Sequence, residues 1–85
     1  MMTDKEILKK QIIYRSEHRG TKEMDLLLGN FGRRHINEFN ISELKDLEQL
    51  LFIDDEVIHN GYFQNNLIKA VPKTKVSELL KKFRI

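Results

Sequence analysis

The chain has 85 residues, of which a third are charged and two-fifths are hydrophobic. This length predicts one domain, near the lower limit at which a single hydrophobic core suffices, and the residue balance is that of a globular rather than a disordered protein. The lack of cysteine excludes disulfides and thiolate metal sites, and no apolar run approaches the ~20 residues that a membrane-spanning helix needs.

A single proline, four glycines and little β-branched alternation predict an all-α fold. The first helix is expected to begin at Thr3, because Thr3 and Glu6 have the spacing of a capping box. It should end between Ser16 and Gly20, where the glycine interrupts the helical pattern. Four residues of this segment have the spacing of one helical face: Ile7, Leu8, Gln11 and Ile12.

A second helix is expected to begin with Thr21 as its cap. Glu23 and Asp25 fall in its first turn and Arg33 and Arg34 near its end, which are the favourable signs for the helix dipole. Because its apolar stripe is the richest in the chain, this helix is placed at the centre of the core. The stripe consists of Met24, Leu27, Leu28, Phe31 and His35.

The remaining sequence predicts three more helices. Residues 37–40 are expected to form a loop, Ser42 to cap the third helix, and Ile41 to pack over its entrance as a hydrophobic staple. Residues 54–56, three carboxylates in a row, are typical of the start of a short fourth helix. Thr74 is expected to cap the last one. The apolar positions of these helices are Leu44, Leu47, Leu50, Leu51, Val57, Ile58, Tyr62, Val76, Leu79, Leu80 and Phe83.

Together these segments predict a compact five-helix bundle in which residues 1–85 form a single domain. The net charge of +2 hides a segregation along the chain: residues 1–35 carry +3, residues 36–66 carry −6 and residues 67–85 carry +5. Such a division suits an oriented protein surface. Solvated helix faces are an equally good interpretation of the same charges.

Catalytic or metal-binding chemistry finds little support in the sequence. His18, His35 and His59 lie in different segments without ligand spacing, and His35 continues the inner stripe of the second helix, so a partly buried histidine is expected there. His18 is expected to be exposed. The carboxylates of residues 54–56 are better explained as a helix start than as an acid–base site. We therefore expect neither an enzyme nor a bound metal.

The basic residues of segment 67–85 raise the alternative of nucleic-acid binding. Direct readout needs a recognition helix with Arg, Asn or Gln aimed at base edges. The last helix offers mainly Lys and Leu, which suits a solvated face, so no nucleic-acid partner is expected.

The most distinctive element is the charged run Arg19-Gly20-Thr21-Lys22-Glu23 at the junction of the first two helices. Arg19 and Glu23 are four residues apart and are expected to pair, while Gly20 leaves room for a turn or for the backbone of a partner. A purely structural role explains these residues equally well. Yet Arg is frequent among interface hot spots, and Tyr14 and Arg15 extend the same patch by one helical turn.

This run resembles the small flavoprotein-assembly factors that help succinate dehydrogenase acquire covalently bound FAD. The hallmark of that family is an Arg-Gly-x-x-Glu motif followed by an acidic residue, a Leu-rich stretch and Phe. The residues that match it are Arg19, Gly20, Glu23, Asp25, Leu26, Leu27, Leu28, Gly29 and Phe31. A second stretch that resembles the family is its Leu-Leu-x-x-Asp-Asp pattern, at Leu50, Leu51, Asp54 and Asp55.

The likeness weakens after Asp55. The family usually has a proline there and then a segment containing Trp, whereas this chain has Glu56 and later Tyr62 and Phe63. One of these two aromatic residues is expected to take the place of the tryptophan in the core.

The resemblance implies a five-helix chaperone that binds the flavoprotein subunit of succinate dehydrogenase and promotes covalent attachment of FAD to a histidine of that subunit. By this resemblance Arg19, Gly20 and Glu23 form the core of the contact surface, with Asp25 nearby. Arg15, one helical turn earlier, is added to this surface because of its position and not because of the resemblance. It leaves open whether fumarate reductase is a second client. FAD is expected to belong to the partner, without tight binding to the free chain, which lacks a nucleotide motif.

The alternative from another class is a generic helical protein–protein adaptor. In either case a monomer without a membrane partner is expected. The N-terminus carries Asp4 and Glu6 and lacks the apolar region of a secretory signal, so we expect a bacterial cytoplasmic protein. A mitochondrial matrix protein without its presequence is the other compartment considered.

Overall fold

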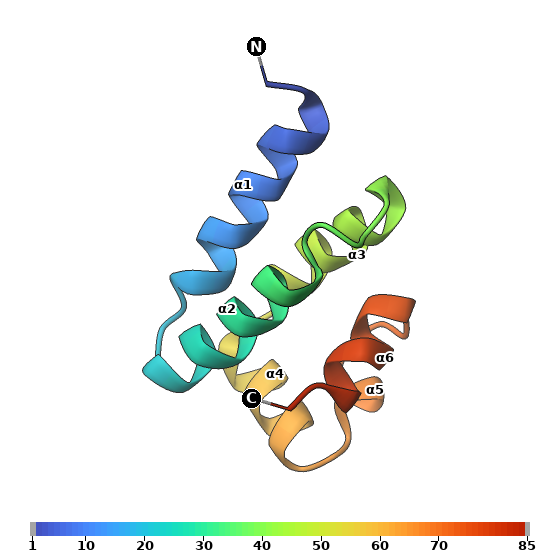
Figure 1. Cartoon of the computed structure of the whole chain (residues 1–85). Coiled ribbons are helices and arrows are strands. Elements are labelled where there is room, and N and C mark those ends of the chain that lie inside the picture. Colours follow the sequence, from blue (N-terminus) through green and yellow to red (C-terminus); the bar gives the residue numbers. More distant parts are fainter. Residues whose placement is uncertain (1, 85) are drawn as a thin grey trace.

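The computed structural model describes residues 2–84, and over this range the chain forms helices joined by short loops (Figure 1). The all-α prediction is confirmed. The helices are α1 (Asp4–Glu17), α2 (Lys22–His35), α3 (Ile41–Leu51), α4 (Asp55–Phe63), α5 (Leu67–Ala70) and α6 (Lys75–Lys82).

Three helices begin at the caps that the sequence predicts. The Thr3 hydroxyl accepts a hydrogen bond from the Glu6 amide at 3.2 Å, and the Glu6 carboxylate accepts one from the Thr3 amide in return. Thr21 accepts from the Met24 amide at 3.2 Å, and Thr74 caps α6. Each cap satisfies an amide that has no partner within its own helix.

The start of α3 differs from the prediction, because Asn40 caps this helix in place of Ser42. Its side chain accepts from the Glu43 amide at 2.9 Å, and the Glu43 carboxylate accepts from the Asn40 amide at 2.9 Å. Ile41 is therefore the first residue of the helix, where it is 46% exposed, and does not act as a staple. Asn40 and Glu43 also have capping-box spacing, so this pair outcompetes Ser42.

The five-helix prediction is corrected to six within residues 2–84, because the four-residue helix α5 was missed. Its cap residue Asn66 makes no side-chain cap bond, and only Leu67 of the helix is buried. A helix of four residues is too short to show a periodic pattern of apolar residues in the sequence. It forms because α4 packs closely on it: a Cβ at Gly61 would lie 3.1 Å from the Cα of Leu67.

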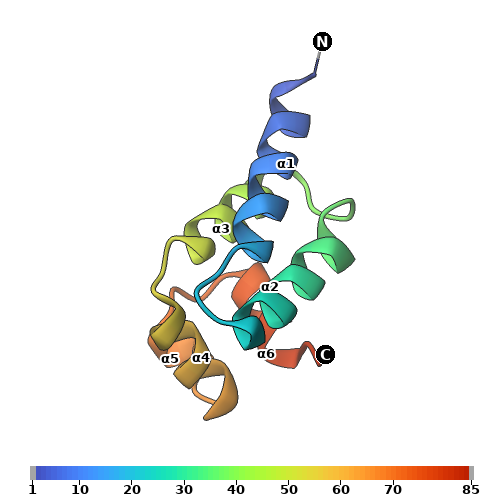
Figure 2. The same ribbon diagram turned by 90° about the vertical axis from the view of Figure 1, so that its left-hand side faces the viewer.

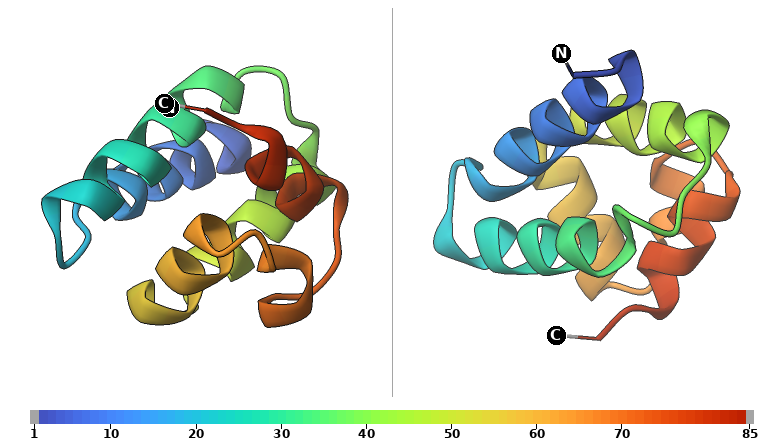
Figure 3. Two further views of the ribbon diagram at one scale, coloured as in Figure 1. Left: turned by 90° about the horizontal axis from the view of Figure 1, so that it is seen from below. Right: turned by 45° about the horizontal axis from the view of Figure 1, so that its top comes forward.

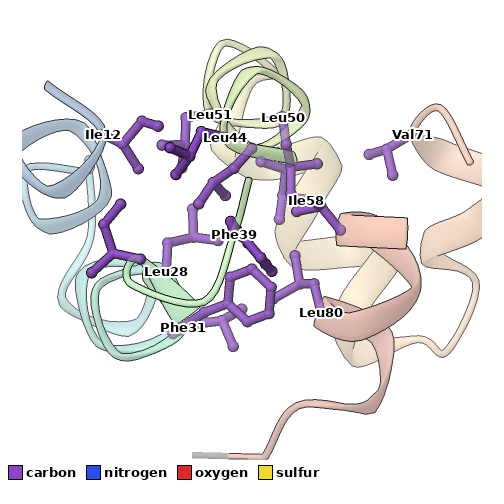
Figure 4. Packing of buried hydrophobic residues seen from close by; sticks show 14 of the residues in the cluster. Ile12, Leu28, Phe31, Phe39, Leu44, Leu50, Leu51, Ile58, Val71 and Leu80 are labelled. Carbon is purple, nitrogen blue, oxygen red and sulfur yellow. The ribbon is translucent and has the colours of Figure 1, made fainter. Parts of the chain in front are cut away.

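The core lies between α2, α3 and α6, with α1 and α4 closing its sides (Figure 4). Phe31 is fully buried at its centre, and its ring meets those of Phe39 and Phe83 at centroid distances of 6.5 Å and 5.4 Å. This confirms the central position predicted for α2. His35 stacks on Phe39 and is partly buried, as expected. Tyr62 packs against the core while Phe63 is 52% exposed, so Tyr62 is the aromatic residue that contributes to it.

Helices α1 and α2 run side by side and approach closely near the turn that joins them (Figure 2). Gly29 and Gly32 on α2 face α1, and a Cβ at Gly32 would lie only 2.9 Å from the hydroxyl of Ser16. Ser16 is fully buried and donates to the carbonyl of Ile12 at 2.7 Å, so its polar atom is satisfied inside the interface. Gly32 therefore sets the spacing of the two helices.

The molecule is elongated, with extents of 42, 25 and 20 Å. The turn between α1 and α2 lies at one side and α6 at the other (Figure 3). Within residues 2–84 there is no helix with both the length and the apolar character required to cross a bilayer.

Candidate partner-binding corner

Residues 18–23, hereafter the corner, connect α1 to α2 and are held by carboxylates from two helices. The amide of Arg19 donates to Oδ1 of Asp25 in the first turn of α2. The next amide, of Gly20, donates to Oδ2 of Asp55 at 2.8 Å. Asp55 is the first residue of α4, which lies more than thirty residues further along the chain. The non-helical part of the corner, residues 18–21, is thus fixed on both sides although it has no regular secondary structure.

The side chain of Arg19 is turned into the molecule, with only 10% of it exposed. Its Nε donates to Oδ1 of Asp55 at 2.7 Å. Its terminal nitrogens donate to the carbonyls of Leu51 at 2.8 Å, Ile53 at 3.2 Å and Arg15 at 3.3 Å. Leu51 ends α3 and Arg15 lies in the last turn of α1, so the cation satisfies carbonyls at two negative helix ends.

The predicted pairing of Arg19 with Glu23 is therefore wrong. The rule that pairs residues four apart needs a continuous helix, and the chain leaves the helical path between α1 and α2. Glu23 instead points to α4, where its Oε2 lies 2.9 Å from Nε2 of His59. Its side chain is 70% exposed. Of the two charged motif residues, Arg19 is used internally and Glu23 faces solvent.

A groove of about 340 Å³ runs beside the corner, between α2 and α4. Gly20 lies at its edge and is exposed. A Cβ at this position would lie 3.3 Å from Oδ2 of Asp55, so a larger residue would press on the carboxylate that holds the corner. The groove is lined by Gly20, Thr21, Met24, Asp55, Glu56, His59 and Asn60.

Arg15 and Asp25, the other predicted contact residues, have different surroundings. Asp25 is half-buried and serves the backbone of the corner. Arg15 lies on the α3 side, where its guanidinium is 3.3 Å from Oε2 of Glu48 and 4.6 Å from the ring centre of Phe52. Both aromatic and cation are partly exposed, which gives this edge of the corner a cation–π pair.

Two residues of α4 that contact the corner, Asp55 and His59, were not singled out from the sequence as site residues. Asp55 was assigned only to the start of a helix and to the family pattern, and His59 was regarded as isolated. Asp55 and His59 each contact a residue 35 or 36 positions away. Local spacing carries no signal for such contacts. One indication was available for Asp55: Asp54 already occupies the N-cap position of α4, so the helix start does not require a second aspartate.

The corner and the groove beside it present hydrogen-bond acceptors at the surface. Glu23 and Glu56 offer exposed carboxylates beside the apolar side chain of Met24, which is buried at the base of the groove. A partner can donate hydrogen bonds to the carboxylates and approach the backbone at Gly20 closely. Among residues 2–84 no three or more His, Cys, Asp or Glu side chains are grouped so as to hold a metal ion.

A family model described as "Flavinator of succinate dehydrogenase" matches residues 10–84, which include the corner and all of α2 to α6. The chain belongs to this family.

Several relatives agree with this assignment. The chain is 38% identical over 77 residues to "Succinate dehydrogenase assembly factor 2, mitochondrial" of Scheffersomyces stipitis, covering 89% of this chain and 52% of the relative. It is 37% identical over 76 residues to the protein of the same name in Dictyostelium discoideum, covering 89% and 52%. The chain thus spans about half the length of these curated flavinator relatives. No solved structure matched it at a significant level.

Proposed function

We propose that this chain is an assembly factor that binds the flavoprotein subunit of succinate dehydrogenase and promotes covalent attachment of FAD to that subunit. Membership of the flavinator family carries the proposal, since the family model covers nearly the whole chain. The curated relatives bear the name of succinate dehydrogenase assembly factors. Because they are about twice as long, the activity is proposed for this chain and is tested below.

The corner is proposed as the contact surface, with a division of roles among the five predicted residues. Gly20 and Glu23 face solvent and contact the flavoprotein, and Arg15 extends the contact along the edge near Phe52. Arg19 and Asp25 position the corner from inside, through the bonds described above. A corner fixed before binding loses little conformational entropy on docking, which favours affinity.

In this proposal the chain acts as a chaperone and not as an enzyme. It contributes orientation of the flavoprotein, while the cofactor supplies the chemistry of its own attachment. FAD belongs to the partner and is not held tightly by this chain. One helical domain over residues 1–85, acting as a monomer, suffices for this role. The chain works where the flavoprotein matures, in the cytoplasm of a bacterium or in the mitochondrial matrix.

The proposal is tested by deleting the gene and measuring covalent flavin on the denatured flavoprotein by in-gel fluorescence. Loss of the signal on deletion and its return with the wild-type chain are expected. Complementation with Glu23→Ala should fail, because the exposed carboxylate is lost while the fold is kept. The pair of Glu23 with His59 is solvent-exposed and contributes less than about 1 kcal/mol to stability.

The matched control is Glu38→Ala in the turn that follows α2. Glu38 is 60% exposed and lies 3.0 Å from a histidine, His35, so it resembles Glu23 in exposure and pairing. Its variant should restore flavin attachment fully. Unchanged covalent flavin in the deletion strain would show the function to be wrong, and normal complementation by Glu23→Ala would show the site to be wrong.

A further inference from the structure

A second groove, of about 400 Å³, is lined by residues of α1 and of the turn that follows α2. Its end near the corner is formed by His18, the residue directly before Arg19. We refer to it as the α1 groove. Its lining consists of Lys9, Lys10, Ile13, Tyr14, Glu17, His18, Ile36 and Asn37.

Two stacked aromatic rings form an exposed platform in the α1 groove. The rings of Tyr14 and His18 lie 4.0 Å apart between centroids with an angle of 18° between their planes. Nδ1 of His18 lies 2.7 Å from the carbonyl of Tyr14. A carbonyl only accepts, so Nδ1 carries the proton and donates, which fixes the ring. Tyr14 is nevertheless 64% exposed, the largest exposed fraction among the exposed large apolar and aromatic side chains of the described chain.

The charge of the α1 groove is positive. Lys10 is exposed, and Lys9 uses one of its three donors on Oδ1 of Asn37 at 3.2 Å. Glu17 is the one acidic residue of the lining, and it is neutralised by Arg33, whose guanidinium binds both of its carboxylate oxygens. This ion pair lowers the pKa of Glu17 below its ordinary value. The two lysine charges of the groove are therefore left to a partner.

We propose that the α1 groove binds an acidic segment of the flavoprotein subunit that carries one apolar anchor residue. The anchor lies on the Tyr14–His18 platform, and the acidic side chains of the segment pair with Lys9 and Lys10. Exposed Tyr with a fixed neighbour is typical of interface hot spots, and the lysines select the sign of the charge by complementarity. This inference rests on the proposed function, because it names the partner.

The α1 groove and the corner together make an interface with two signs of charge. Exposed Glu23 and, across the groove beside the corner, exposed Glu56 of α4 are acidic, whereas the α1 groove presents Lys9 and Lys10. A partner that matches both surfaces fits in one orientation only, since reversal would place like charges together. The α1 groove thereby supplies the orientation that flavin attachment needs.

The experiment measures the affinity of the full-length chain for the purified flavoprotein subunit by titration calorimetry. Tyr14→Ala should raise Kd by about tenfold or more. Its control is Phe63→Ala, which removes another aromatic ring that is 52% exposed but lies outside both the corner and the α1 groove, and which should leave Kd unchanged. Lys10→Glu should also weaken binding and reduce its dependence on salt, whereas Lys82→Glu on α6 should not.

The occupant is identified by placing a photoreactive phenylalanine analogue at position 14 and mapping the cross-linked peptide. An acidic peptide of the flavoprotein with an apolar residue is expected. A basic peptide, or a cross-link between two copies of this chain, would overturn the proposal. If Glu23→Ala weakens binding while Tyr14→Ala and Lys10→Glu bind as wild type, the α1 groove is refuted and the corner stands. If the wild-type chain does not bind the flavoprotein, both proposals fail.

Discussion

Arg19 shows how a single buried cation organises a surface that it does not itself present. Its donors reach acceptors on α1, α3, α4 and the loop between α3 and α4. The planar fork of a guanidinium suits several acceptors at once, which a lysine ammonium would not bind in the same geometry. The exposed residues Gly20 and Glu23 are held in place by this internal network.

At the residue scale we expect Arg19→Ala to lower the free energy of unfolding by about 3 kcal/mol, because Asp55 and three carbonyls lose their shared partner in a largely buried site. Urea denaturation measures the change. Arg34→Ala, at an exposed position of α2, should stay within about 0.5 kcal/mol of wild type. Equal stabilities of the two variants would contradict the role assigned to Arg19.

The sequence was informative about residues wherever the relevant neighbour lay within a turn. Thr3, Thr21 and Thr74 were identified as caps because each satisfies an amide three residues ahead. The partners of Arg19 and Glu23 could not be found in this way, since they depend on where α4 packs. A four-residue spacing predicted an ion pair that the break between α1 and α2 prevents.

At the element scale the contact between α1 and α2 depends on the size of one side chain. Gly32→Ala should destabilise the protein by about 1–3 kcal/mol despite the higher helix propensity of Ala, because the new methyl group would lie 2.9 Å from the hydroxyl of Ser16. Thermal unfolding followed by circular dichroism measures the loss. Adding Ser16→Ala should restore part of it by removing that hydroxyl.

Gly29→Ala is the matched control on the same helix. Its new methyl group would meet the flexible side chain of Glu17 at 3.3 Å, and this side chain can move aside. Because Ala is favoured over Gly inside a helix by about 1 kcal/mol, this variant should be neutral or more stable than wild type. A Gly29→Ala variant as unstable as Gly32→Ala would show that the close approach to Ser16 is not the cause.

Helix periodicity predicted five elements because each has an apolar stripe and a cap or an acidic start. It failed for α5, whose four residues contain a single buried side chain, Leu67. This turn depends on the neighbouring α4, and its existence follows from tertiary packing. The same reason explains why the groove beside the corner, formed by α2 and α4, could not be predicted from either helix alone.

At the scale of the whole molecule the stability depends on one continuous core. Phe31 is fully buried and joins the aromatic rings of the α2–α3 loop and of the C-terminal segment. Phe31→Ala should cost about 3–5 kcal/mol, a large part of the roughly 5–15 kcal/mol available to a small domain. Urea unfolding measures it, and Phe63→Ala, at an exposed position, should cost far less. An unchanged unfolding midpoint for Phe31→Ala would contradict the central position of α2.

The acidic and basic segments of the sequence lie at different places on the folded chain. The acidic block includes the carboxylates of α4 beside the corner, and the basic N-terminal block lines the α1 groove. Sequence alone could not separate a solvated face from a recognition surface, because both give the same segregation of charge. The arrangement of the two grooves around the junction of α1 and α2 is what favours recognition.

The reach of Arg19 has a consequence for the order of events in the cell. Its acceptors Leu51, Ile53 and Asp55 lie 32 to 36 residues downstream. A nascent chain that has been synthesised only as far as α2 therefore contains all residues of the Arg-Gly-x-x-Glu motif. It still lacks the acceptors that hold Arg19 in its folded position. The surface proposed for docking is therefore complete only after α3 and α4 have packed against the guanidinium of Arg19.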